Sequence, residues 1–255
     1  MISFPLRLCV LVCMMGAIAG TGRGAEELPI VAKARAYLGP DAALDAVRSI
    51  HFVGTLVKAD PADPAKQLRS AIEIISQKQP ERQRVRETSE KAIEVTALDG
   101  YDGWRRVEDA ADPSKWQQSL LGPAQVKFMR ANTWENVAFY RGIERRGGRV
   151  EDQGPMTIDG VACEKVAFIH GPGIVFYRYF DRATGRLVLT ETESGATIRE
   201  EGEIKVNGIH FPKTLIQTTK TGNGQSITLT LNFETVTLNE TLPAELFTVP
   251  MLRAK

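Results

Sequence analysis

The chain has 255 residues, of which 25% are charged and 43% are hydrophobic, and its formal net charge at pH 7 is +1. This balance gives no electrostatic footprint for nucleic acid or for an anionic membrane surface, so no nucleic-acid partner is expected. No internal repeat or low-complexity tract divides the sequence, and its length suits one all-β domain with a large core.

The first 24 residues have the features of a secretory signal peptide. Arg7 precedes an apolar run over 8–15, and small residues follow, including an Ala17-Ile18-Ala19 triplet typical of a cleavage site. A membrane anchor is the alternative, but about a dozen apolar residues fall short of the about 20 that span a bilayer. We therefore expect export, with cleavage after Ala19 or nearer Gly24.

Cysteine usage indicates a compartment for the exported chain. Cys9 and Cys13 lie inside the signal, which leaves Cys163 alone and excludes an intramolecular disulfide. Because Val12, not a small residue, precedes Cys13, we expect no lipid anchor. These features fit a bacterial periplasm better than a disulfide-stapled secreted domain. Within its predicted strand, Cys163 is interpreted as a structural thiol in preference to a catalytic one.

The first predicted elements are helices, and strands follow them. Residues 28–50 carry apolar residues at helical spacing, with a stop at Gly39-Pro40 and a second helix from Asp41. Alternating apolar and polar residues then predict strands. These strands cover 50–58, 68–77, 82–89 and 91–100. Asp-Gly pairs at 99–100 and 102–103 supply tight turns before Trp104.

Residues 112–146 are predicted to interrupt the strands as a helical, lid-like insertion. Apolar and aromatic residues cluster between Pro123 and Tyr140, which favours one or two helices lying between the two halves of the sheet. The basic, glycine-rich stretch over 141–149 is interpreted as a solvated linker rather than an anion site.

The second half is predicted to be strands almost throughout. They cover 157–169, 174–181, 186–194, 196–206, 209–220 and 225–238. The two-residue Asn207-Gly208 turn is the strongest hairpin signal, and residues 243–250 are expected to place Phe247 against the body of the protein. About ten or eleven strands in a mostly up-and-down order must curl to hide one face, as a barrel or a partly open one. The predicted helices are natural covers for its open side.

No motif for catalysis or metal binding stands out. His51, His170 and His210 have no metal-ligand spacing, so ordinary polar or strand-edge positions are favoured over a site made by long-range convergence. Neither GxSxG nor SxxK occurs, and the glutamates within 200–203 are interpreted as a solvated strand face. We expect no catalytic residue, no metal and no cofactor.

The prominent feature is apolar area on alternate strand positions. In SITLTLNFE (226–234), apolar side chains point one way and polar side chains the other. Such a face covers either a packed core or a cavity for an apolar ligand, and the pattern leaves both open. The candidate cavity-lining residues are Phe52, Ile72, Ile74, Val95, Trp104, Phe128, Met129, Trp134, Phe168, Phe176, Leu189, Leu229 and Leu231.

Several stretches, in their order and spacing, resemble the LolA/LolB-like superfamily of periplasmic outer-membrane lipoprotein carriers or lipoprotein-sorting proteins. They are ARAYLGPDAALDAVRSIHFVGTL (34–56), LDGYDGWR (98–105), YFDRATGRLV (179–188), KVNGIHFPKTL (205–215) and LPAELFTVP (242–250). The resemblance implies a mainly β (α+β) fold over residues 25–255. It would be an unclosed antiparallel β-barrel of about eleven strands, with helices covering the open face.

The same resemblance implies a function. In that superfamily the concave apolar face receives acyl chains, without cofactor or catalysis. We therefore expect a non-catalytic, monomeric periplasmic carrier or binder of lipoprotein acyl chains or other lipid, serving outer-membrane biogenesis between an inner-membrane donor and an outer-membrane acceptor. Residues 123–140 are expected to form its movable cover. The alternative is a structural or interaction module of the envelope with a filled core, and an enzyme ranks third.

Overall fold

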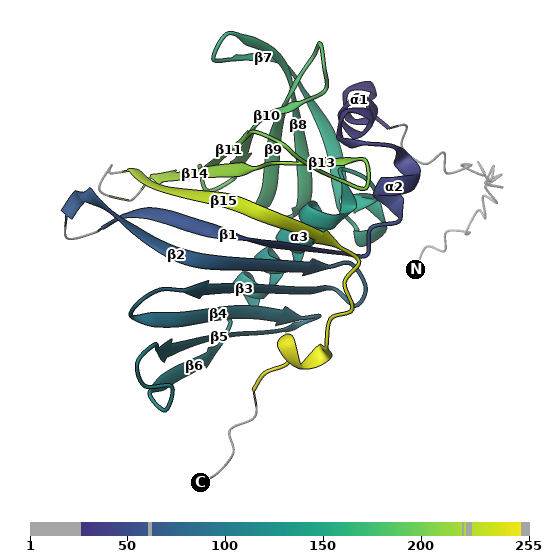
Figure 1. Ribbon diagram of the computed structural model, residues 1–255. Coiled ribbons are helices and arrows are strands. Elements are labelled where there is room, and N and C mark those ends of the chain that lie inside the picture. Colours follow the sequence, from purple (N-terminus) through teal and green to yellow (C-terminus); the bar gives the residue numbers. More distant parts are fainter. Residues whose placement is uncertain (1–26, 61–62, 221, 223–225, 251–255) are drawn as a thin grey trace, which may run out of the picture.

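The computed structural model describes residues 27–60, 63–220, 222 and 226–250, and the predicted signal peptide lies outside them. The protein is mainly β, and Figure 1 shows one large, strongly curved and unclosed antiparallel sheet with few helices. The sheet has 13 strands in the order β6-β5-β4-β3-β2-β1-β15-β14-β11-β10-β9-β8-β7. The predicted fold class, an open antiparallel barrel, is therefore confirmed.

The strands divide into two halves of the chain. The first half contains β1 (Ser49–Asp60), β2 (Asp63–Gln77), β3 (Arg82–Thr88), β4 (Ala92–Asp99), β5 (Asp102–Asp109) and β6 (Trp116–Leu120). The second contains β7 (Arg149–Ile158), β8 (Val161–Gly171), β9 (Ile174–Asp181), β10 (Leu187–Thr192), β11 (Thr197–Glu201), β14 (Thr214–Lys220) and β15 (Ser226–Leu238). A separate hairpin consists of β12 (Ile204–Val206) and β13 (Ile209–Phe211).

The two halves meet along β1 and β15. Ile50 pairs with Leu238 and Lys58 pairs with Leu229, with a register break between Val53 and Gly54. The first and last strands of the chain therefore lie side by side in the middle of the sheet (Figure 1).

Three α-helices lie against the sheet. They are α1 (Pro29–Leu38), α2 (Asp41–Asp45) and α3 (Pro123–Ala138), with short 3₁₀ turns η1 (Ile143–Arg146) and η2 (Ala244–Leu246). Pro123 occupies the first turn of α3, where its missing N–H costs nothing, and the preceding Gly122 N–H donates to Gln125 Oε1. Helix α3 packs across β2–β5 on the concave face. Among the described residues, no helix has the length and hydrophobicity needed to cross a membrane.

The structure differs from the sequence prediction at the two edges of the sheet. Residues 116–120, predicted as part of a helical insertion, form strand β6, and β7 begins at Arg149, the last residue of the predicted linker, and extends to Ile158. Both are edge strands whose side chains are mostly exposed or half-exposed. Their sequences therefore lack the alternation of apolar and polar residues from which a strand is predicted. The predicted strands 196–206 and 209–220 are each divided, and Pro212 lies between β13 and β14.

The turn chemistry was predicted more accurately. Asn207 and Gly208 have φ values of 51° and 82° and join β12 to β13 through the Val206–Ile209 pair, as a two-residue hairpin requires. Helix α1 ends at Leu38 before Gly39, which confirms the predicted stop.

The C-terminal segment covers the face of β3–β5 opposite helix α3. Phe247 is fully buried, its ring lies under the Arg82 guanidinium, and its carbonyl oxygen accepts a 2.7 Å hydrogen bond from Trp104 Nε1. Trp104 shares its face with its neighbour Ala97, whereas the adjacent Gly103 faces α3. The predicted placement of Phe247 is confirmed.

Trp104→Phe is expected to lower the free energy of unfolding by about 1–3 kcal/mol, because the buried Phe247 carbonyl loses its donor. Urea unfolding followed by circular dichroism measures this loss. Trp116→Phe, on the exposed edge strand, is the matched control and should stay within about 0.5 kcal/mol of wild type. Equal losses in the two variants would show that the hydrogen bond does not hold the segment.

Candidate functional site: a cavity between the sheet and helix α3

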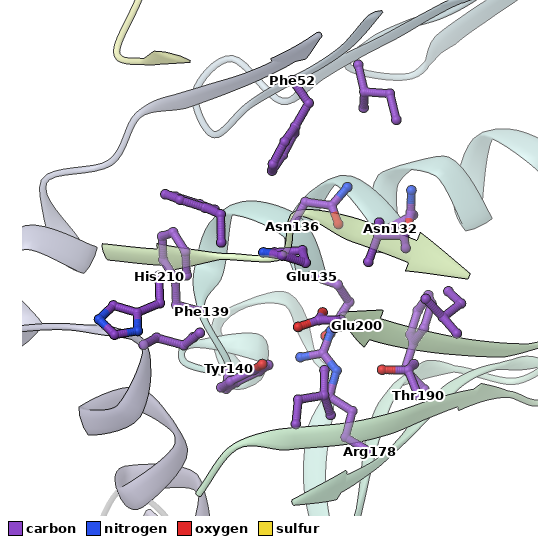
Figure 2. A pocket seen from close by; sticks show the side chains of 18 of the residues that line it. Phe52, Asn132, Glu135, Asn136, Phe139, Tyr140, Arg178, Thr190, Glu200 and His210 are labelled. Carbon is purple, nitrogen blue, oxygen red and sulfur yellow. The ribbon is translucent and has the colours of Figure 1, made fainter. Parts of the chain in front are cut away.

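A cavity of about 180 Å³ lies on the concave side of the sheet. Strands from both halves line it, together with α3 and the β12–β13 hairpin (Figure 2). One part of the lining is apolar and another part carries charged and amide side chains. The two parts are described in turn.

The apolar wall is formed by aromatic and aliphatic side chains around the β1–β15 seam. The Phe52 ring lies 4.6 Å from the Phe233 ring and 5.8 Å from the Phe211 ring, measured between centroids. Ile74 on β2 and Leu215 on β14 extend this wall to either side. Residues paired directly across neighbouring strands share a face, and the pairs Phe52–Ile74 and Leu215–Leu231 place the wall of the main sheet on its concave face. Phe211 reaches this wall from the separate β12–β13 hairpin.

The polar wall is centred on Glu135 of α3. Its Oε1 contacts Nε2 of His170 on β8, and its Oε2 lies 2.7 Å from Nη2 of Arg178 on β9. The side chains of Glu135, His170 and Arg178 are 4%, 7% and 8% exposed. This buried cluster therefore ties helix α3 directly to the second half of the sheet.

The Arg178 guanidinium is also enclosed by aromatic rings. Its Cζ lies 4.5 Å from the centroid of Tyr140 and 5.0 Å from that of Phe168. Such stacking is favourable for the planar, delocalised cation. Burial raises the pKa of Tyr140 well above its usual value of 10, so this hydroxyl stays protonated.

Glu200 on β11 completes the polar wall (Figure 2). Burial raises its pKa from 4.5 to about 7, and the nearby Arg178 and Arg186 limit the rise. The folded protein therefore holds a proton that the unfolded chain releases. This contribution to stability is fully present below pH 4.5 and is lost as the pH rises to about 7.

A second tie holds the C-terminal end of α3. Arg35 of α1 is 1% exposed, and its Nη1 donates a 2.7 Å hydrogen bond to the carbonyl oxygen of Phe139. The same guanidinium pairs with Asp41 and Asp45. Phe139 has a left-handed backbone conformation, φ 49°, that ends the helix. The C-terminal part of α3 is thus fixed by α1 at Phe139 and by the sheet at Glu135.

The structure brings some predicted residues together at this cavity. Phe52, Ile74 and Phe176 line it. Ile72 and Phe168 are buried beside these residues, at 3% and 1% exposure. Leu229 and Leu231 are half-buried further along the concave face of β15 that also carries Phe233.

Phe128 and Met129 lie on the N-terminal half of α3, before the part of the helix that lines the cavity, in an open groove of about 920 Å³. Pro172 and Ile174, from the turn between β8 and β9, line the same groove. Phe128 is 44% exposed, and its ring centroid is 5.9 Å from that of Phe176.

Four candidate residues lie away from the cavity. Trp104 packs against the C-terminal segment. Val95 lies on β4, on the same face of the sheet as Trp104, and this face is turned away from the cavity. Leu189 belongs to a separate cluster with Cys163, Tyr179 and Val188. Trp134 packs under the Arg146 guanidinium, 5.1 Å from its ring centroid.

The sequence interpretation missed the polar wall. Glu200 was assigned to a solvated face, and Glu135 and Arg178 were not singled out. Arg178 itself could have indicated the polar wall. It is a cation inside the apolar strand IVFYRYFD, and it points to the same face as Phe176 and Phe180. A long-range acidic partner was the natural expectation for it.

The described residues contain no group of three or more His, Cys, Asp and Glu side chains placed to bind a metal ion. Cys163 is buried and free, and burial, helped by Asp181, raises the pKa of its thiol. A thiol with a raised pKa is a poor nucleophile, which favours the structural interpretation of Cys163.

Solved structures share this fold. A LolA superfamily protein from Nitrosomonas europaea matches with a TM-score of 0.54 and 16% identity, over 86% of this chain and 96% of that chain. A putative outer membrane lipoprotein-sorting protein domain from Vibrio parahaemolyticus matches with a TM-score of 0.53 and 9% identity, over 84% and 93%. A DUF1329 family protein from Desulfovibrio piger matches with a TM-score of 0.54 and 9% identity, over 86% and 95%.

No protein-family model and no curated protein matches the sequence. At such low identities the structural likeness concerns the fold alone. The chain has the LolA-like fold, and the resemblance inferred from its turn and strand pattern is confirmed at that level.

Proposed function

We propose that this protein of LolA-like fold is a non-catalytic carrier or binder of lipoprotein acyl chains or other lipidic cargo. The observation that carries the proposal is the largely apolar cavity on the concave face beneath α3. The proposed setting is the periplasm, after removal of the predicted signal peptide, with residues 25–255 acting as one monomeric domain in outer-membrane biogenesis. An inner-membrane donor and an outer-membrane acceptor are the proposed partners.

The size of the cavity makes α3 part of the proposed mechanism. A cavity of about 150 Å³ accommodates one benzene molecule, so 180 Å³ holds only a short piece of an acyl chain. Longer cargo therefore requires α3 to move. Because Phe176 lines the cavity and the neighbouring Phe128 lines the groove, displacement of Phe128 would join the two spaces.

Energetics also favour a cover that competes with cargo. Each buried methylene gains about 0.8 kcal/mol relative to water, but a membrane offers nearly the same gain. A permanently open apolar groove would therefore have little net drive to extract or release a chain. A helix fixed by a few polar ties provides the competing occupant.

Leu215→Trp is expected to weaken binding of a fluorescent acyl probe by about tenfold or more, because the larger ring fills a cavity that is already small. Ile216→Trp is the matched control, since Ile216 is the next residue on β14 and points to the opposite face. Fluorescence titration measures both affinities. Mass spectrometry of gently purified wild-type protein, which should contain lipid, provides the independent readout.

The small volume of the cavity favours one competing function, an envelope interaction module with a filled core. That function predicts no copurified lipid and no saturable probe binding in the wild type. Equal probe affinities for Leu215→Trp and Ile216→Trp would likewise show that any binding occurs elsewhere.

A further inference from the structure

The unexplained feature of the cavity is its buried guanidinium. Among the described residues, Arg178 has one ionic contact, between its Nη2 and Glu135 Oε2. Within the part of the chain that the structure describes, its Nε and Nη1 have no hydrogen-bond acceptor, although both atoms are buried. Arginine has five N–H donors and cannot release its proton, so the three N–H groups on these two nitrogens carry a desolvation cost without a compensating hydrogen bond.

The neighbouring side chains do not supply the missing acceptor. Glu135 contacts His170 through Oε1, its Oε2 pairs with Arg178 Nη2 by charge without hydrogen-bond geometry, and the Tyr140 and Phe168 rings stack on the guanidinium. Because Arg178 lines the cavity, an occupant of the cavity can supply an acceptor. Figure 2 shows Arg178 and Glu200 reaching into the same space from different strands.

The opposite wall restricts the chemistry of that occupant. Phe52, Phe233 and Leu215 present hydrocarbon, whereas Arg178 and its neighbours present charge. A molecule with an anionic end and an apolar tail satisfies both walls. Glu135 and Glu200 repel a doubly charged phosphate more strongly than a singly charged carboxylate.

Building on the carrier function proposed above, we propose that the cavity selects amphiphiles with a carboxylate head group, which Arg178 binds while the hydrocarbon tail lies against Phe52, Leu215 and Phe233. This specificity extends the acyl-binding function to free carboxylic acids, such as fatty acids. The bound carboxylate supplies the acceptor that the guanidinium lacks, and charge-assisted hydrogen bonds are the strongest that such a site can form.

Glu200 makes this selection pH-dependent. With its pKa raised to about 7, Glu200 is protonated at pH 6, when it can donate a hydrogen bond to the bound carboxylate. At pH 8 it is ionised and repels that carboxylate. The titratable and charged groups that face the same space are Tyr37, Glu135, Tyr140, Arg178, Arg186, Glu203 and His210. We therefore expect octanoate to bind more tightly at pH 6 than at pH 8.

Isothermal titration calorimetry with octanoate, 1-octanol and inorganic phosphate tests this specificity. Wild type should bind octanoate about tenfold or more tightly than octanol at pH 6, and phosphate should bind weakly or not at all. Arg178→Lys keeps the charge next to Glu135 but loses the extra donors, so it should lose the preference for octanoate and keep octanol binding. Arg199→Lys, on the opposite face of β11, is the matched control and should behave as wild type.

A second variant keeps the test independent of the stability of Arg178→Lys. Glu200→Gln is expected to abolish the difference in octanoate affinity between pH 6 and pH 8 while leaving octanol binding unchanged. Equal wild-type affinity for octanoate and octanol would overturn the carboxylate site but leave the carrier function intact. Phosphate binding as tight as octanoate would overturn the requirement for an apolar tail. If neither octanoate nor octanol binds, the carrier function itself fails.

Discussion

Glu135→Leu is expected to lower the free energy of unfolding by about 3–5 kcal/mol, because it leaves the buried Arg178 charge without its anionic partner. Both side chains are less than 9% exposed, so water cannot replace the lost carboxylate without opening the structure. His170 loses its partner at the same time. Urea unfolding at pH 7, followed by circular dichroism and tryptophan fluorescence, measures the change.

The double variant Glu135→Leu/Arg178→Met separates charge from packing. Replacing both members of a buried ion pair by apolar residues is often close to neutral, so most of the lost stability should return. Glu144→Leu, at an exposed position in η1, is the control for a glutamate-to-leucine change and should stay within about 0.5 kcal/mol of wild type. A double variant as unstable as Glu135→Leu would show that shape, and not the unpaired charge, causes the loss.

Gly54→Ala is expected to destabilise the fold by about 3 kcal/mol or more, because β1 and β15 approach too closely there for a side chain. A Cβ at Gly54 would lie 2.0 Å from the carbonyl oxygen of Asn232 and 2.9 Å from Cα of Phe233. These are backbone atoms, which cannot rotate away as a flexible side chain can. The two strands would have to separate at the register break next to Val53.

Gly122→Ala is the matched control for this substitution. A Cβ at Gly122 would meet only Gln125 Oε1, at 3.7 Å, and its φ of −70° is accessible to alanine. Its cost should be below about 1 kcal/mol, typical of a change at a helix N-cap. Urea unfolding midpoints of Gly54→Ala and Gly122→Ala that agree with each other would contradict the close approach between β1 and β15.

The sequence pattern was sufficient for the elements whose burial follows a simple period. The residues of β15 alternate between apolar and polar from Ile227 to Phe233, and strand pairing places Leu229, Leu231 and Phe233 on one face. Asn207-Gly208 specifies the β12–β13 hairpin from local backbone preference alone. The edge strand β6 was not predicted, because its side chains are not buried in a regular pattern. In β6, WQQSL has almost no buried side chain, so no hydrophobic period distinguishes it from loop or helix.

The cavity was only partly predictable because alternation assigns a residue to one of two faces without saying which face is concave. Trp104 and Gly103 are neighbours on β5, yet Trp104 packs against Phe247 and Gly103 faces α3. The irregularity between Leu187 and Leu189 then changes the parity within β10. Leu189 consequently joins a cluster outside the cavity, although it continues the apolar run.

The polar wall needed tertiary information. Glu135 lies on α3, Arg178 on β9 and Glu200 on β11, and the three come together because β9 and β11 both flank β10 and α3 covers the concave face. In the sequence each is one charged residue among many. Arg178 alone was recognisable, since an arginine with the parity of two buried phenylalanines requires a partner.

The central position of β1 and β15 also affects how the chain is made. Local hairpins can form in each half as it emerges, but pairing Ile50 with Leu238 must wait for β15, about 190 residues further along the chain. Until residues 226–238 are available, the edge of β1 that β15 covers presents unsatisfied backbone groups to any other extended chain nearby. The interval of greatest aggregation risk therefore falls just before β15 joins the sheet, when one missing strand leaves the centre of the sheet open.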